Sequence, residues 1–229
     1  MTDSPEPDPG RRWLYHFTHV DNLAAIRAAG CLNCDAVARQ SMTRTEVGAK
    51  DIKESRRRRP IPVAPGGHVG DYVPFYFAPR SPMMYRIACD RRDSVPDRYQ
   101  GGDGPLVYLA TTVGAVVDAG STWVATDGNA ATATTEFTSD LQTMDHMVDW
   151  ALMEAERWNS TPDDPDRQRR RQAEFLVHRS VPLTLIRWVG VRDDRHKHHV
   201  SKLLVDHALG RRVIVRPHWY YGYERRRTT

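Results

Sequence analysis

One carboxylate, Glu174, separates an arginine run from an apolar run in the stretch RRRQAEFLVHR, residues 169–179. The apolar run has the composition of a buried strand, which places the acid at a strand end. One interpretation is a surface glutamate paired with neighbouring arginines, a contact that adds little stability. The other is a catalytic carboxylate. The stretch alone leaves both interpretations open.

Two polar residues in YHFTH, His16 and Thr18, are spaced to share one face of a strand. They are either the polar face of an edge strand or a pair that hydrogen-bonds the hydroxyl groups of a ligand. Aromatic residues gather in DYVPFYFAPRSPMMY, and most of them are expected in the core. Tyr76 comes just before a turn, where its ring can stack on a flat ligand.

Cysteine and histidine spacing gives little support for a metal site. Cys31 and Cys34 have zinc-knuckle spacing, but a structural zinc needs four ligands and only Cys89 remains. The HKHH run lies in a polar segment and indicates solvated surface. The sequence has no P-loop, HExxH, GxSxG or dinucleotide-binding glycine pattern. It therefore predicts no bound metal.

The elements that must position these residues mix strands and helices. Strands are predicted at residues 13–20, 72–77, 104–113, 122–126, 173–179, 185–191 and 211–221. Helices are predicted at 21–30, 81–89, 114–120 and 194–209, with the longest at 140–158, and a long loop is predicted at 36–70. Because the order lacks a steady βαβ rhythm, we expect an α+β fold with a central mixed or antiparallel sheet and peripheral helices.

Length and composition limit the class of protein. The 229 residues suit one compact domain, which we assign to 13–229, after an acidic, proline-rich lead at 1–12 that is predicted to be disordered. No apolar run approaches the roughly 20 residues that span a bilayer. With only three cysteines, we expect a soluble cytoplasmic protein without a membrane partner. Arginine clusters at 56–59, 167–171 and 225–227 favour a polyanionic partner.

Four motifs taken together resemble one known family. YHFTHVDNL, DYVPFYFAPRSPMMY, TDGNAA and RRRQAEFLV occur in the order seen in the DarT family of DNA ADP-ribosyltransferase toxins. The resemblance runs from Trp13 through the final VIVRPHWYY, nearly the whole chain, and is greatest to the branch that modifies thymidine in single-stranded DNA. It implies an ADP-ribosyltransferase (PARP-like) fold.

The resemblance implies that NAD is a co-substrate. Such enzymes break the bond between nicotinamide and ribose and pass ADP-ribose to a nucleophile through a transition state that resembles an oxocarbenium ion. Glu174 would hold the ribose 2′-hydroxyl and favour the cationic ribose. The arginines that flank it in sequence would keep it ionised through their positive charge. This implication favours the catalytic interpretation of Glu174.

The same resemblance assigns NAD contacts to other residues. His16 and Thr18 match an H-x-T element and would bind the adenosine-side ribose, with Asn22 as a further NAD contact. Tyr76 would stack on the nicotinamide. Arg80 and Met83 would line the same pocket, and the forked guanidinium of Arg80 suits the pyrophosphate.

The resemblance also assigns a DNA side. Arg56 would act on the target base by electrostatic stabilisation of its deprotonated form, because arginine is a poor base. Arg57, Arg58, Arg59 and Asn129 would contact single-stranded DNA, mainly through the loop at 36–70. A macrodomain antitoxin (DarG-like) that removes the modification is the implied protein partner, and the enzyme would be a toxin that blocks replication. No metal is implied.

Two alternative functions remain open from the sequence. One is an ADP-ribosyltransferase that modifies protein or RNA. The other is a non-catalytic nucleic-acid-binding module in which Glu174 has only a structural role.

Overall fold

A mixed sheet forms the centre of the computed structural model, which describes residues 8–39 and 45–222. Among these residues, eight strands pair in the order β10-β9-β4-β1-β3-β7-β5-β6, and only β9 and β10 are parallel. Their bounds are β1 Trp13–His19, β3 Tyr72–Tyr76, β4 Leu106–Thr112, β5 Trp123–Thr126, β6 Phe137–Thr138, β7 Glu174–His178, β9 Trp188–Val191 and β10 Val213–Val215. The expected α+β architecture with a mixed sheet is confirmed.

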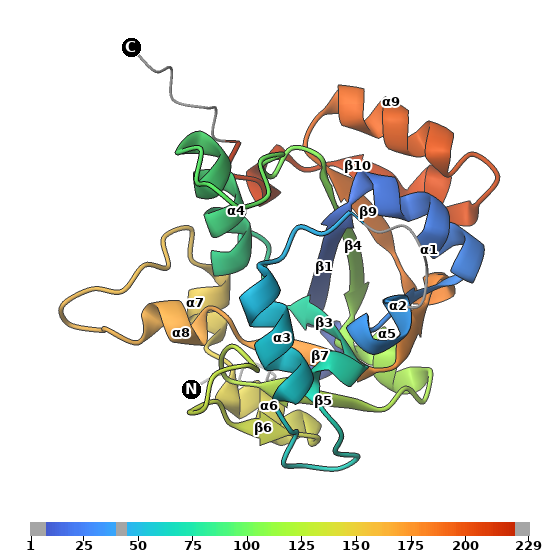
Figure 1. The fold of residues 1–229 in the computed structure, drawn as a ribbon. Coiled ribbons are helices and arrows are strands. Elements are labelled where there is room, and N and C mark those ends of the chain that lie inside the picture. The colour runs from blue at the N-terminus through green and yellow to red at the C-terminus, as the bar shows by residue number, and fades with distance from the viewer. Residues whose placement is uncertain (1–7, 40–44, 223–229) are drawn as a thin grey trace, which may run out of the picture.

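Helices surround this sheet (Figure 1). Helix α3 lies in front of β3 and β7, α9 lies beside β9 and β10, and α6 lies beside β5. The bounds of the helices are α1 Leu23–Ala29, α2 Asp35–Ala38, α3 Lys50–Arg58, α4 Pro82–Arg92, α5 Val113–Asp118, α6 Leu141–Met147, α7 Trp150–Glu154, α8 Arg167–Arg170 and α9 Asp194–Leu203. A two-stranded sheet joins β2 (Cys31–Asn33) to β8 (Ser180–Pro182), and the sequence did not predict it.

The central strands bring distant residues to one place. Strand β7 is buried along most of its length, as its apolar run predicts, and it pairs antiparallel with β3. This register sets Tyr76 opposite Glu174, and Tyr15 of β1 lies opposite Tyr76 on the other side. The ends of β3 and β7 therefore meet beside the middle of β1.

Helix α4 begins where the sequence predicts. Ser81 caps it, accepting a hydrogen bond from the backbone N–H of Met84 at 3.3 Å, and Pro82 occupies the first helical turn. Gly30 adopts a left-handed conformation (φ 68°) that ends α1, also as predicted.

The prediction of a long loop at 36–70 is wrong for part of that segment. Residues 36–38 belong to α2, and α3 occupies Lys50–Arg58; residues 40–44 lie outside the described part of the chain. Helix α3 has almost no apolar pattern. Asp51 lies near its positive N-terminus, and Glu54 pairs with Arg58 one turn later at 3.0 Å.

The prediction of a single longest helix at 140–158 is also wrong. The segment breaks into α6 and α7, because Val148 has an extended backbone and Asp149 begins a new helix. The carboxylate of Asp149 accepts a hydrogen bond from the backbone N–H of Leu152 at 3.0 Å. The apolar periodicity suggested one helix, but an N-cap residue within the segment begins a second one.

Part of the predicted disordered lead is ordered. Residues 1–7 lie outside the described residues, but Pro9–Arg11 form a short 3-10 helix that Asp8 caps and that packs on α5. Arg12 donates to Asp145 at 3.1 Å and lies 3.8 Å above the Trp150 ring. In the described part of the chain, no helix is long and apolar enough to cross a membrane.

Candidate active site

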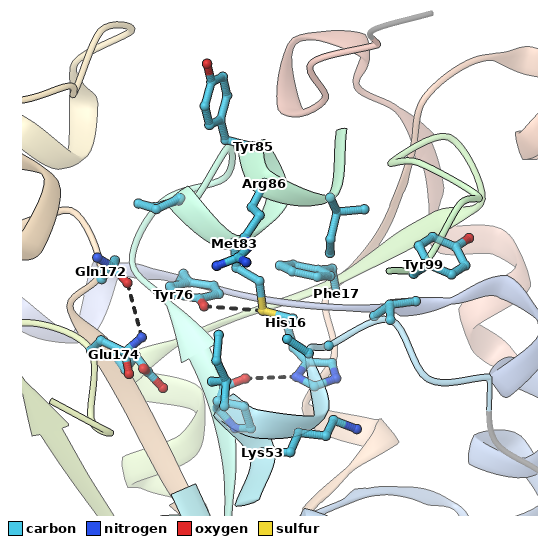
Figure 2. Close-up of a pocket in the computed structure, with 18 of the residues that line it drawn as sticks. His16, Phe17, Lys53, Tyr76, Met83, Tyr85, Arg86, Tyr99, Gln172 and Glu174 are labelled. Atoms are coloured by element: carbon cyan, nitrogen blue, oxygen red, sulfur yellow. Dashed lines mark hydrogen bonds between the residues drawn. The ribbon is translucent and has the colours of Figure 1, made fainter. Parts of the chain in front are cut away.

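A cavity of about 970 Å³ opens between β1, α3, α4 and the ends of β3 and β7 (Figure 2). Nine residues that the sequence marked line this one cavity, although they come from five separate segments of the chain: His16, Thr18, Asn22, Arg56, Tyr76, Arg80, Met83, Asn129 and Glu174. Arg57, Arg58 and Arg59 do not line it. The cavity is large enough for a dinucleotide-sized ligand.

Glu174 is buried at the base of this cavity, with a side chain only 1% exposed. Arg56 of α3 binds it with a forked contact, from Nη1 to Oε1 at 2.9 Å and from Nη2 to Oε2 at 2.8 Å. The backbone N–H of Ala130 also donates to Oε1, at 3.2 Å. Three N–H groups therefore hold the carboxylate in one orientation.

The positive partner of Glu174 comes from α3 and not from its sequence neighbours. Arg169 donates to Asp127 and Asp166, and Arg170 donates to Asp149 and Asp164. The sequence-based interpretation, in which flanking arginines keep Glu174 ionised, is therefore wrong. Two of these four carboxylates, Asp164 and Asp166, belong to the acidic turn DDPD that precedes the arginines.

Arg171, the remaining flanking arginine, is buried and binds backbone carbonyls instead of the carboxylate. Its guanidinium donates to the carbonyl oxygens of Leu152, Met153 and Ala155 at the end of α7 and to that of Pro79. Burial lowers the pKa of Arg171 to about 10. Its contacts fix α7 against the turn that precedes α4.

Arg56 remains charged in this setting. Burial on its own would lower its pKa, but the attraction and hydrogen bonds of Glu174 outweigh burial and raise the pKa above its ordinary value. The two residues therefore form an ion pair at the base of the cavity. Such a pair is costly to break because either partner would be left buried without its counter-charge.

Tyr76 places an aromatic ring next to Glu174 through the pairing of β3 with β7. Phe17 lies nearly parallel to this ring, with centroids 6.2 Å apart and an angle of 13° between the planes. The phenol hydroxyl donates to the sulfur of Met83 at 3.7 Å (Figure 2). Burial and the nearby Glu174 carboxylate raise the pKa of Tyr76 far above its ordinary value, so the ring is neutral.

His16, Thr18 and Asn22 contribute polar groups to the lining of the cavity. The Nδ1 of His16 donates to the carbonyl oxygen of Pro74 at 2.8 Å, which fixes the protonated nitrogen because a carbonyl only accepts. Asn22 donates to the hydroxyl of Thr18 at 3.0 Å and to the carbonyl oxygen of Thr45 at 3.1 Å. Asn22 thus joins β1 to the segment that leads into α3.

Arg80 adopts a left-handed backbone conformation (φ 54°), which is strained for a residue with a side chain. Its N–H donates to the hydroxyl of Tyr108 at 3.3 Å, and its carbonyl oxygen accepts from the hydroxyl of Tyr221 at 2.8 Å. Its guanidinium lies 4.5 Å above the Tyr221 ring. Two tyrosine hydroxyls therefore stabilise an unfavourable conformation at the wall of the cavity, as is common at functional sites.

Comparison with known proteins decides the family. The family described as ssDNA thymidine ADP-ribosyltransferase, DarT, matches residues 15–221. This chain belongs to the DarT family. A DNA ADP-ribosyl transferase of Mycobacterium tuberculosis is 39% identical over 213 residues, which cover 91% of this chain and 89% of the relative.

Solved structures agree with this assignment. Thermus sp. 2.9 DarT in complex with ADP-ribosylated ssDNA is 35% identical, covers 95% of this chain and 98% of its own, and superposes with a TM-score of 0.81. The same protein in complex with NAD⁺ is 34% identical, covers 95% and 99% of the two chains, and has a TM-score of 0.77. The predicted resemblance and the ADP-ribosyltransferase fold are confirmed.

A more distant DarT relative carries a second enzyme. A DNA ADP-ribosyl transferase-DNA ADP-ribosyl glycohydrolase fusion protein of Thermosipho africanus is 26% identical over 211 residues. The match covers 91% of this chain and 49% of the fusion protein.

Three arginines predicted to bind DNA lie outside the DarT cavity. Arg57 donates from Nε to the carboxylate of Asp35 at 2.6 Å, and Arg59 donates to the carbonyl oxygen of Ala133 at 3.1 Å. Arg58 is largely exposed beside Glu54. Arg58 and Arg59 line a separate recess of about 380 Å³ on the outer face of α3. DNA binding by these residues stays a prediction.

Sequence reasoning missed several cations of the cavity. Lys53, Arg86, Arg98 and Arg157 line it, and Figure 2 shows Arg86 extending from α4 toward it. Of these four, only Arg86 could have been predicted from the sequence. It follows Met83 by three residues on a predicted helix and so lies on the same helix face. Within residues 8–39 and 45–222, no group of three or more His, Cys, Asp and Glu side chains could hold a metal ion.

Proposed function

We propose that this chain transfers ADP-ribose from NAD to a thymine base in single-stranded DNA. The forked Arg56–Glu174 pair at the base of the cavity, with Tyr76 beside it, is the observation that carries the proposal. Thermus sp. 2.9 DarT, which has been solved with NAD⁺ and with ADP-ribosylated ssDNA, supports the choice of both substrates.

The roles of the cavity residues follow from the chemistry of NAD. Loss of nicotinamide leaves positive charge on the ribose, and a carboxylate that binds the 2′-hydroxyl stabilises that charge. Glu174 has this role, and the forked contact with Arg56 holds its carboxylate in place. The Tyr76 ring stacks on the nicotinamide. His16, Thr18 and Asn22 bind the adenosine side, and Arg80 and Met83 line the wall beside the pyrophosphate.

The acceptor base approaches from the side of α3 and of the turn at Asn129. Arg56 stabilises the base as it loses its proton, while Arg57, Arg58 and Arg59 attract the DNA backbone. Because a base inside a duplex cannot reach the buried Glu174, the substrate is single-stranded DNA. The transferase domain spans 13–229, and the segment 36–70 with α3 contacts the DNA.

The fusion protein of Thermosipho africanus, which joins a transferase to a DNA ADP-ribosyl glycohydrolase, supports a proposal for the biological role. The enzyme is the toxin of a toxin–antitoxin system and modifies DNA in the cytoplasm, which blocks replication. A macrodomain antitoxin removes the modification. No metal takes part in this proposal.

Labelled NAD tests the proposed function. The protein is incubated with NAD and a mixed pool of single-stranded oligonucleotides, with the same sequences as duplexes, or with protein acceptors. We expect label on thymine-containing single strands, located by mass spectrometry. Label on protein alone would instead support a protein-modifying transferase, and no turnover of NAD would support a non-catalytic module.

Replacement of Arg80 by Gly should weaken NAD binding and yet stabilise the fold. Glycine removes the guanidinium but adopts φ 54° without strain, and relief of a left-handed residue is worth about 1–2 kcal/mol. Loss of one charged contact to the pyrophosphate costs about tenfold or more in affinity. Calorimetry measures both the melting temperature and NAD binding.

Arg179 is the matched control for this experiment. It is exposed, it has the same kind of backbone conformation (φ 63°), and it does not line the cavity. Arg179→Gly should raise the melting temperature and leave NAD affinity unchanged. Equal NAD affinity in Arg80→Gly and wild type would remove Arg80 from the binding site.

Tyr76→Ala should lower the affinity for NAD more than the affinity for DNA. Stacking on one aromatic ring is worth roughly 1–3 kcal/mol, or about 5- to 150-fold in affinity. Tyr76→Phe is the control, because it keeps the ring and removes only the hydroxyl that contacts Met83. If Tyr76→Ala binds NAD as well as Tyr76→Phe does, Tyr76 is only a core residue.

A further inference from the structure

The C-terminal segment, residues 219–222, lies beside α4, where Figure 1 shows it in red. Trp219 and Tyr220 are buried in one apolar cluster with Met84 and Ile87 of α4. The next residue, Tyr221, lines the cavity. This segment therefore reaches the wall of the proposed NAD site from the far end of the described chain.

The C-terminal segment holds the peptide groups of Arg80 on both sides. The N–H of Arg80 donates to the hydroxyl of Tyr108 at 3.3 Å, and that hydroxyl donates to the carbonyl oxygen of Trp219 at 3.2 Å. The carbonyl oxygen of Arg80 accepts from the hydroxyl of Tyr221 at 2.8 Å, and this second hydroxyl accepts from the indole N–H of Trp158 at 2.9 Å. Each hydroxyl has one orientation, because an N–H only donates and a carbonyl oxygen only accepts.

Asp103, which lies just before β4, anchors the C-terminal segment. Its side chain is buried, with the residue only 1% exposed. One carboxylate oxygen, Oδ2, accepts from the backbone N–H of Tyr221 at 2.7 Å and from that of Gly222 at 2.9 Å. Such charge-assisted hydrogen bonds are about twice as strong as bonds between neutral groups. Asp103 therefore fixes the backbone from which the Tyr221 side chain extends.

Tyr221 also contacts the side chain of Arg80, whose guanidinium lies 4.5 Å above the Tyr221 ring. The left-handed backbone of Arg80 (φ 54°) is unfavourable for a residue with a side chain, so it depends on these contacts. The guanidinium also lies 3.8 Å from the carboxylate of Glu156, but that side chain is 86% exposed and such a pair adds little. Tyr221 thus sets both the backbone and the guanidinium of Arg80.

We propose that Asp103 and Tyr221 are positioning residues for NAD binding: Asp103 fixes the C-terminal segment, and Tyr221 holds the Arg80 guanidinium where it binds the pyrophosphate. The inference rests on the proposed function, which sets Arg80 beside the pyrophosphate. It adds the C-terminal segment to the parts of the chain that determine NAD affinity. Neither residue belongs to the four motifs on which the family resemblance rests.

A double-mutant cycle, measured by calorimetric titration with NAD, tests the proposal. Tyr221→Phe keeps the ring and removes the hydroxyl. Arg80→Gly keeps the peptide groups and removes the guanidinium. NAD affinity, melting temperature and the rate of NAD hydrolysis at saturating NAD are measured for both variants and for the double variant. Tyr220→Phe is the matched control, because it removes a neighbouring buried hydroxyl that binds Leu106 and Gly190 and does not line the cavity.

We expect Tyr221→Phe to weaken NAD binding about fivefold, which is the effect of one lost hydrogen bond. The rate of hydrolysis at saturating NAD should stay within about twofold of wild type, because the pyrophosphate is bound equally before and during the reaction. In the Arg80→Gly background, Tyr221→Phe should change NAD affinity less than about twofold, since no guanidinium remains to be positioned. The melting temperature should fall in both backgrounds.

Asp103 is tested with two substitutions. Asp103→Ala leaves the N–H groups of Tyr221 and Gly222 without their acceptor and should weaken NAD binding about fivefold, again only when the Arg80 guanidinium is present. Asp103→Asn keeps an oxygen that accepts these N–H groups, so its NAD affinity should stay within about twofold of wild type. If Asp103→Ala does not fold, the cycle of Tyr221→Phe with Arg80→Gly decides.

Three results would overturn the inference alone. The first is unchanged NAD affinity in Tyr221→Phe. The second is an equal loss of affinity with and without the Arg80 guanidinium, which would mean that the hydroxyl acts on NAD by another route. The third is a loss in Tyr220→Phe as large as that in Tyr221→Phe, which indicates general destabilisation. If wild type binds no NAD, the proposed function itself fails, and the inference fails with it.

Discussion

Glu174→Gln lowers the rate of ADP-ribose transfer by at least about 100-fold, with NAD binding retained. Loss of a charge that stabilises the transition state typically costs about 3 kcal/mol or more. The amide keeps an oxygen for the backbone N–H of Ala130 but cannot balance the charge of Arg56. We therefore expect a folded protein with a lower melting temperature. Single-turnover assays with labelled NAD measure the transfer, and calorimetry measures binding.

Glu136 provides the control for this substitution. It is an exposed carboxylate on the neighbouring turn and does not line the cavity. Glu136→Gln should behave like wild type in every assay. Near wild-type transfer by a folded Glu174→Gln protein would end the catalytic assignment and return Glu174 to a structural role.

Arg56→Ala should lower the rate of transfer as much as Glu174→Gln does, and it should also destabilise the fold. Removing one partner of a buried ion pair costs about 3–5 kcal/mol, because the other charge is left without its partner. The carboxylate of Glu174 would retain only the Ala130 N–H as a donor. Transfer to DNA should fall at least about 100-fold, and NAD hydrolysis should fall as well, by a smaller factor. Chemical denaturation and paired activity assays measure these effects.

Arg58→Ala is the control that separates the specific role of Arg56 from a general effect of positive charge on α3. Arg58 lies on the same helix, is largely exposed and makes one surface pair with Glu54. Its loss should leave stability and NAD hydrolysis unchanged and weaken only DNA binding. The slope of DNA affinity against salt concentration, on logarithmic scales, should fall by about one, as expected for one lost phosphate contact. If Arg56→Ala and Arg58→Ala gave the same small effects, the arginines of α3 would be an interchangeable charged surface.

The sequence predicts the parts of the site that lie on apolar strands. The run after Glu174 marks a buried strand, and the alternation in YHFTH sets His16 and Thr18 on one face. The cap at Ser81 marks the start of α4. These signals lie within short stretches of sequence, so they can be recognised without knowledge of the fold.

Contacts between distant segments could not be predicted in the same way. Helix α3 is short and highly charged. Two of its partners are Asp35 in α2 and Glu174, which is 118 residues away from Arg56. Sequence proximity suggested Arg169–Arg171 as the counter-charge of Glu174, but each of them has other partners. Arg80 is similar: its left-handed backbone depends on Tyr108 and Tyr221, whose positions only the fold provides.

A structure of the Glu174→Gln protein with NAD and a short thymine-containing single strand tests the central claim most directly. The account predicts the nicotinamide ring against Tyr76, the adjacent ribose 2′-hydroxyl within hydrogen-bond distance of residue 174, and the acceptor base beside Arg56 and Asn129. NAD bound elsewhere, or bound with its adenine end at residue 174, would contradict it.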